Sequence, residues 1–122
     1  MNNEVFGDVI FNYGFETKIK ISLCGSDYNI ILSADAYFEK DGITKEQEHA
    51  YEDFKRNSEE ILLKVEEKLK EKELSNDFKP TLMVIKRNGN YGLVFDNKTD
   101  VENGIVILIN PSIEIMSVDQ IL

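Results

Sequence analysis

The chain has one histidine and one cysteine, and these two residues limit the metal and nucleophilic chemistry open to it. His49 lies among carboxylates, but a pair with Asp53 lacks the further ligands that a metal site needs. Cys24 precedes a glycine and has no nearby base to make a thiolate. We therefore expect a solvated His49, a structural Cys24, no catalytic residue and no cofactor. An enzyme built from carboxylates or backbone groups alone is the remaining catalytic alternative.

The segment 96–104 is the stretch most similar to a binding site. It offers oxygen donors at Asp96, Asp100 and Glu102, which are ligands that a hard cation such as Ca²⁺ prefers. Its spacing is not that of an EF-hand loop, and Lys98 opposes a cation. We expect an ordinary acidic loop here, with cation binding as the alternative.

The charge of the chain points to its class of partner. There are 23 acidic and 14 basic side chains, a net charge of −9 at neutral pH. Such a charge disfavours nucleic acid and membranes, and it favours a basic protein. The acidic residues expected to meet that protein are Glu46, Glu48, Glu52 and Asp53 in a predicted helix, and Asp96, Asp100 and Glu102 in the loop. Solubility alone is the simpler interpretation of the same charge.

The first third of the chain predicts strands. Residues 17–24 alternate polar and apolar side chains with a period of two, which is typical of a strand with one buried face. Residues 5–13 and 28–34 follow a similar pattern, and turn residues separate them at 13–16 and 25–27.

The middle of the chain predicts a helix from 44 to 73. Thr44 and Gln47 have the spacing of a capping box, and apolar residues then recur at steps of three and four. A second capping pattern predicts a break near Asn57.

Strand patterns return at 81–87, 91–95 and 104–109, followed by a final segment at 113–116. Asn88-Gly89 between the first two predicts a hairpin. The order β-β-β-α-β-β-β predicts an α+β fold: a mainly antiparallel sheet of about six strands with one long helix on one face. We expect residues 1–122 to form a single domain.

The late strands are apolar on both faces, whereas a single helix covers only one. Either the first strands fold over and bury the far face, or that face stays exposed. In the second case it forms an apolar patch through which a structural or adaptor domain self-associates as a homodimer. The residues of this patch are Met83, Ile85, Val94, Val106 and Leu108.

The compartment follows from what the sequence lacks. A single cysteine excludes an internal disulfide, and the first residues do not resemble a secretion signal. No apolar run approaches the roughly 20 residues of a membrane helix. We expect a cytoplasmic protein.

Several motifs together resemble a family of small bacterial domains of unknown function built from strands, one helix and strands. They are Phe6-Gly7, residues 43–47 with Ala50-Tyr51 and Phe54, Lys79-Pro80, residues 91–96, residues 100–105 and Pro111. Members of such families are similar to immunity proteins encoded beside polymorphic toxins. The resemblance implies a non-enzymatic inhibitor that occludes its target, and it identifies no functional residues.

Overall fold

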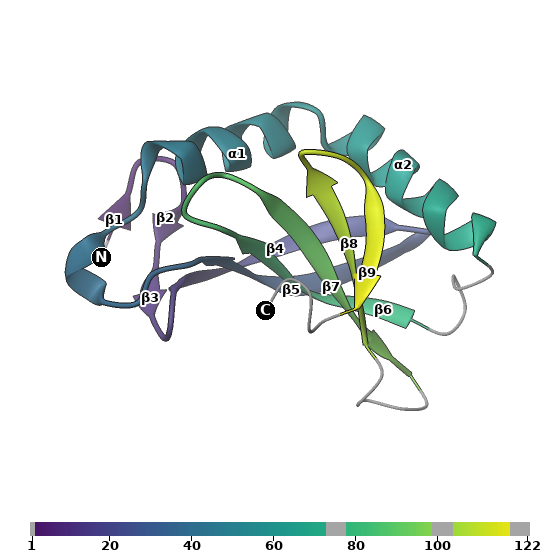
Figure 1. Cartoon of the computed structure of the whole chain (residues 1–122), viewed down its shortest axis with the longest axis horizontal. Coiled ribbons are helices and arrows are strands. Elements are labelled where there is room, and N and C mark those ends of the chain that lie inside the picture. Colours follow the sequence, from purple (N-terminus) through teal and green to yellow (C-terminus); the bar gives the residue numbers. More distant parts are fainter. Residues whose placement is uncertain (1, 73–77, 99–103, 118–122) are drawn as a thin grey trace.

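The computed structural model describes residues 2–72, 78–98 and 104–117 (Figure 1). Its main element is a sheet of seven strands in the order β3-β4-β5-β6-β7-β8-β9. These strands are β3 (Ile10–Phe11), β4 (Phe15–Leu23), β5 (Ser26–Ala34), β6 (Phe78–Ile85), β7 (Tyr91–Asn97), β8 (Ile105–Asn110) and β9 (Glu114–Ser117). A separate pair, β1 (Asn2–Asn3) and β2 (Gly7–Asp8), precedes the sheet.

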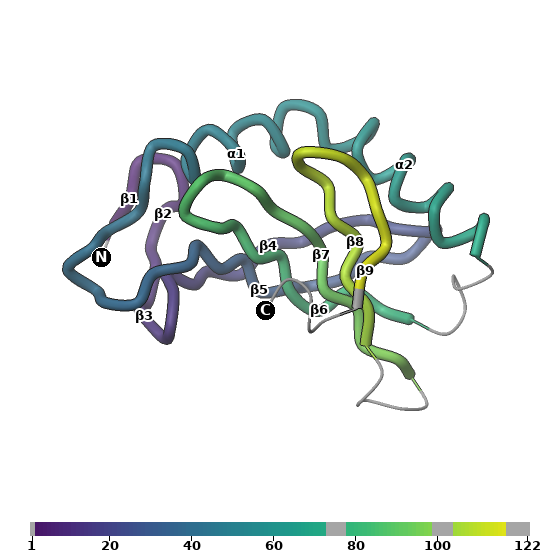
Figure 2. Tube along the Cα trace, in the orientation of Figure 1, coloured from purple at the N-terminus to yellow at the C-terminus, as the bar shows by residue number. Residues whose placement is uncertain are grey.

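Two helices connect the halves of this sheet. After β5 the chain forms the short helix η1 (Glu39–Asp41), then α1 (Lys45–Arg56) and α2 (Ser58–Glu71), and returns to β6 (Figure 2). This crossover makes β5 and β6 parallel, while all other neighbours in the sheet are antiparallel. Both helices run along one face of the sheet (Figure 1). The predicted α+β class, with a mainly antiparallel sheet covered on one face, is confirmed.

The helix begins and breaks where the sequence predicts. Thr44 Oγ1 accepts a hydrogen bond from the backbone amide of Gln47 at 3.1 Å, and Gln47 Oε1 accepts one from the backbone amide of Thr44 at 2.9 Å. Asn57 separates α1 from α2, and its Nδ2 donates to the carbonyl oxygen of Asp53 at 3.2 Å. A side chain that competes for helix carbonyls in this way favours a break.

The first predicted strand, 5–13, is interrupted. The side-chain oxygen of Asn3 accepts hydrogen bonds from the amides of Val5 and Phe6, which closes a turn there. Gly7 has a φ of 77°, a backbone conformation that interrupts an extended strand. Only the short strands β2 and β3 remain of that stretch.

The turn between β4 and β5 is tighter than the predicted one. Only Cys24 and Gly25 lie between the paired residues Leu23 and Ser26, and both have positive φ, at 50° and 79°. Two such residues are typical of the type I′ turn, which fits the twist of a hairpin. The turn therefore fixes the register of β4 on β5.

The core fills the space between the sheet and the helices. Phe54, Val65 and Leu69 of the helices are buried in the same cluster as Leu32 and Phe95 of the sheet. A second, smaller cluster consists of Val84, Val94 and Val106 on the opposite face of the sheet.

The five apolar residues of the predicted patch do not share one exposed face. Met83 and Ile85 belong to the main core, and Val94 and Val106 to the second cluster. Leu108 is half-buried. Four of the five residues are therefore buried within the chain. They divide between the two faces of the sheet, because side chains of one strand alternate between those faces.

Gln47 joins the end of the sheet to the start of α1. Its side chain is fully buried, and its Nε2 donates to the carbonyl oxygens of Asp35 (2.9 Å) and Ile85 (3.0 Å). Asp35 follows β5 and Ile85 ends β6, so one amide group links the two parallel strands to the helix cap.

Arg87 completes this polar network from the outside. Its guanidinium donates to the carbonyl oxygens of Asp35, Asp41 and Gly42, while its own carbonyl accepts from Thr44 Oγ1 at 2.8 Å. The segment from β5 to α1 is thus held on β6 by hydrogen bonds to its backbone.

We predict that Gln47→Glu destabilises the protein by about 3 kcal/mol at neutral pH, because a buried carboxylate would face two carbonyl oxygens. Burial raises the pKa of such a carboxyl, and its protonated form can donate one hydrogen bond. Stability is therefore retained at low pH and lost as pH rises through that raised pKa. Urea unfolding at about pH 4.5 and about pH 7.5 should show a larger loss at the higher pH.

His49→Ala is the matched control, since His49 is exposed on the same helix, and it should change stability by less than about 0.5 kcal/mol. An equal loss at both pH values for Gln47→Glu would contradict a buried, charge-sensitive network.

Candidate protein-binding site

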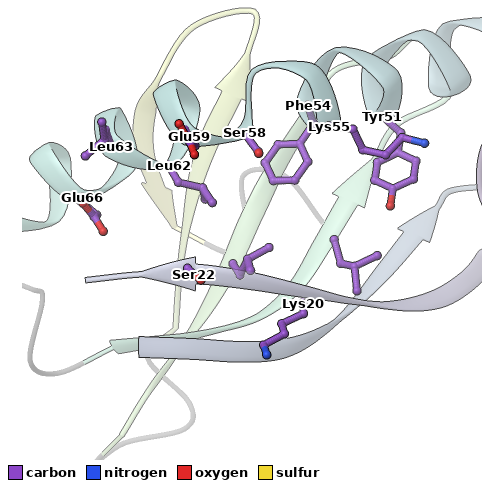
Figure 3. A pocket seen from close by; sticks show the side chains of 12 residues that line it. Lys20, Ser22, Tyr51, Phe54, Lys55, Ser58, Glu59, Leu62, Leu63 and Glu66 are labelled. Carbon is purple, nitrogen blue, oxygen red and sulfur yellow. The ribbon is translucent and has the colours of Figure 1, made fainter. Parts of the chain in front are cut away.

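A groove of about 620 Å³ lies between β4 and the two helices (Figure 3). It spans the break at Asn57, with one wall from α1 and α2 and the other from β4. The lining residues are Ile19, Lys20, Ile21, Ser22, Tyr51, Phe54, Lys55, Ser58, Glu59, Leu62, Leu63 and Glu66.

The apolar part of the groove follows from the spacing on the helices. Phe54, Ser58 and Leu62 are separated by four residues each, so they lie on one side of the helical segment. The side chains of Phe54 and Leu62 project toward β4 in Figure 3. Leu63 also lines the groove and is 58% exposed, unlike Phe54 and Leu62, which are buried.

The other wall of the groove is an open sheet edge. β3 pairs only with Phe15 and Glu16 of β4, so within the described residues Thr17–Leu23 has no strand on its outer side. The two-residue turn makes Leu23 and Ser26 a hydrogen-bonded pair, and in an antiparallel ladder every second residue forms such a pair. Ile19, Ile21 and Leu23 therefore bond to β5 through their backbone. The backbone groups of the residues between them and before them, Lys18, Lys20 and Ser22, point outward.

The charged side chains at the groove are partly engaged with the chain itself. Lys55 lies over the ring of Tyr51, 4.6 Å from its centroid, and donates to the carbonyl oxygen of Val5. Lys20 forms an ion pair with Asp27 at 3.3 Å, on the exposed surface. A hydrogen bond from Ser22 and the contact with Lys20 lower the pKa of Asp27. Glu59 has no ion pair within the described part of the chain.

Cys24 lies at the end of the groove wall and is exposed. Partial burial raises the pKa of its thiol, and the nearby Glu66 carboxylate raises it further. Glu66 also accepts a hydrogen bond from the Cys24 amide. The thiol is therefore protonated at neutral pH, which is the opposite of what a nucleophile needs.

The predicted acidic residues of the helix lie on α1. Glu46, Glu52 and Asp53 are exposed, while Glu48 is half-buried and accepts a hydrogen bond from Asn3 at 3.1 Å. The Asp53 carboxylate also accepts one from Asn57 at 3.0 Å.

The structure does not bring Asp96 to this helix. The rings of Phe54 on α1 and Tyr91 meet edge to face, with their centroids 6.2 Å apart, so the start of β7 lies beside α1. Burial, and then the Asp53 carboxylate, raise the pKa of Tyr91. Asp96 is half-buried near the other end of β7, and Asp100 and Glu102 lie outside the described residues. Of the acidic residues predicted in the loop, the described one, Asp96, therefore lies apart from those of α1.

No group of three His, Cys, Asp or Glu side chains gathers as metal ligands within residues 2–72, 78–98 and 104–117. His49 is exposed and belongs to no such group among these residues. Most of the predicted cation loop at 96–104 lies outside the described residues, so cation binding there stays a prediction. None of the described helices has the length and apolar character to cross a membrane.

Residues 5–120 match the family model DUF6985, a domain of unknown function. The chain belongs to the DUF6985 family. Searches of curated proteins and of solved structures found no match. The family membership confirms a domain family of unknown function, and the role of this DUF6985 domain has to be argued from its own surface.

Sequence reasoning missed the groove of the DUF6985 domain. The apolar alternation of residues 17–24 marks a strand but does not say that the strand lies at an edge. Leu63 could have indicated an apolar surface beside the helix, because it follows Leu62 and falls outside the apolar stripe of the helix.

We predict that Cys24 reacts slowly with iodoacetamide at neutral pH and that its rate rises only above the ordinary thiol pKa of about 8.5. Glu66→Gln should move this rate profile to lower pH, because it removes a negative charge and keeps an acceptor for the Cys24 amide. Alkylation followed by mass spectrometry measures both profiles, with Glu67→Gln as control. A wild-type profile centred below about pH 7 would contradict a raised pKa and reopen a catalytic role.

Proposed function

We propose that this DUF6985 domain is a non-enzymatic cytoplasmic binding protein of the immunity or inhibitor kind, which occludes a basic protein such as a toxin. The proposal is supported chiefly by the exposed carboxylates of α1. Glu46, Glu52 and Asp53 point to solvent, and within the described part of the chain none of them forms an ion pair. Unpaired charge on a rigid helix is available to a partner of opposite sign.

The overall charge acts in the same direction. A net charge of −9 on 122 residues attracts a basic protein over about a Debye length, roughly 8 Å at physiological salt. This attraction raises the association rate more than it raises the final affinity. An inhibitor that must reach its target before damage is done benefits from a fast encounter.

We predict that reversing Glu46 and Glu52 to lysine slows association with the partner by about tenfold at low salt. The matched control reverses Glu67 and Glu71, which are exposed on α2 and change the net charge equally. Each tagged protein is used to capture partners from its native cells at low salt, and mass spectrometry identifies what is retained. A basic protein should be held by the wild type and by the control, and recovered in a smaller amount with Glu46→Lys/Glu52→Lys.

The identified protein then allows the association rates to be measured at several salt concentrations. A rate that falls equally in both variants would attribute the effect to net charge and not to α1. Retention unchanged by either variant and by salt would contradict binding through acidic residues.

A further inference from the structure

We infer that the outer edge of β4 binds an extended segment of a partner protein as an added strand, with apolar side chains on one side of the segment and acidic side chains on the other. The inference rests on the proposed function only in taking the partner to be a protein. The inference requires no particular net charge of that partner, because only one short strand of the partner makes the contact.

The backbone of β4 supplies the first part of the argument. From Thr17 onward this strand has no neighbour on its outer side within the described residues, and the amides and carbonyls of Lys18, Lys20 and Ser22 point outward. Unpaired groups of this kind form a template for another strand. The edge is not blocked by a proline, since none occurs before Pro80.

The groove supplies the second part. Alternate side chains of an added strand would point toward the helices, on the same side as Ile19 and Ile21. Ile19 and Tyr51 are half-buried there, and Leu63 is exposed. Apolar side chains of the partner would complete the burial of these three residues.

Lysines on the opposite face of β4 supply the third part. Lys18 has no ion pair within the described residues, and Lys20 has only its exposed pair with Asp27. Figure 3 shows Lys20 on the side of the strand away from Phe54 and Leu62. Cross-strand pairs favour opposite charges, so aspartate or glutamate of the partner fits opposite these lysines.

The same lysines argue against a second copy of the chain at this edge. An antiparallel pairing of two β4 strands centred on Lys20 or on Ile19 would place lysine opposite lysine. Lysines at an edge are a common protection against such self-pairing. The charge pattern therefore disfavours these two registers of a homodimer through β4 and favours an acidic strand.

The test uses a blocked synthetic peptide that alternates valine with aspartate, and a control peptide that alternates valine with lysine. Titration of the labelled protein, followed by NMR, should show shifts of the Lys18, Lys20 and Ser22 amides with the acidic peptide. Binding of the lysine peptide should be at least about tenfold weaker. Equal binding of both peptides, shifts located elsewhere, or no binding of the acidic peptide would overturn the inference.

Three variants separate the backbone from the charges. Lys20→Pro removes an outward amide and the Lys20 charge without touching the ladder to β5, whereas Lys20→Gln removes the charge alone. The proline variant should abolish peptide binding with its circular dichroism spectrum retained, and the glutamine variant should only weaken binding. Lys18→Glu/Lys20→Glu keeps the backbone and should exchange the preference in favour of the lysine peptide. If the proline variant does not fold, the charge-swapped variant alone decides, and an unchanged preference would overturn the inference.

The failure of this inference is distinguishable from that of the proposed function. Glu46→Lys/Glu52→Lys should leave peptide binding unchanged, since these residues do not line the groove. Capture of a basic protein through α1 without any peptide binding would overturn strand addition alone. A dimer seen by light scattering, dissociated by Lys20→Pro, would overturn the choice of an acidic partner strand.

Discussion

The fold depends on the satisfaction of a few backbone groups where the parallel strands meet the helix. A crossover from β5 to β6 leaves carbonyls at the ends of both strands, and the chain must bury them beside the first turn of α1. The Gln47 side chain meets these carbonyls and the Thr44 amide at once. Without it, the helix cap and the sheet would each lose hydrogen bonds in a buried position.

This anchor also determines where a partner can bind. The helical segment starts beyond the ends of β5 and β6 and runs back along the sheet (Figure 1), so residues on both sides of the break between α1 and α2 line one groove with β4. The β4–β5 hairpin lies at one side of the sheet, because β6 occupies the other side of β5. A groove bordered by an open strand follows from these two constraints, and the acidic face of α1 lies outside it.

Local rules predicted the parts of this fold that depend on nearby residues. The capping box at Thr44, the break at Asn57 and the Asn88-Gly89 hairpin all follow from short-range chemistry. The parallel pairing of β5 with β6 and the open edge of β4 were not predicted, because strand order depends on contacts distant in sequence. For the same reason the acidic residues could be listed from the sequence, but not the separation of Asp96 from the helix.

The open edge of β4 is the central claim, and amide hydrogen exchange of the free protein tests it most directly. Lys18, Lys20 and Ser22 should exchange at least about tenfold faster than Ile19, Ile21 and Leu23, whose amides face β5. Such an alternation along one strand would show that its outer backbone groups are free. Uniform protection of all six amides would show that the edge is already covered, and it would contradict the account.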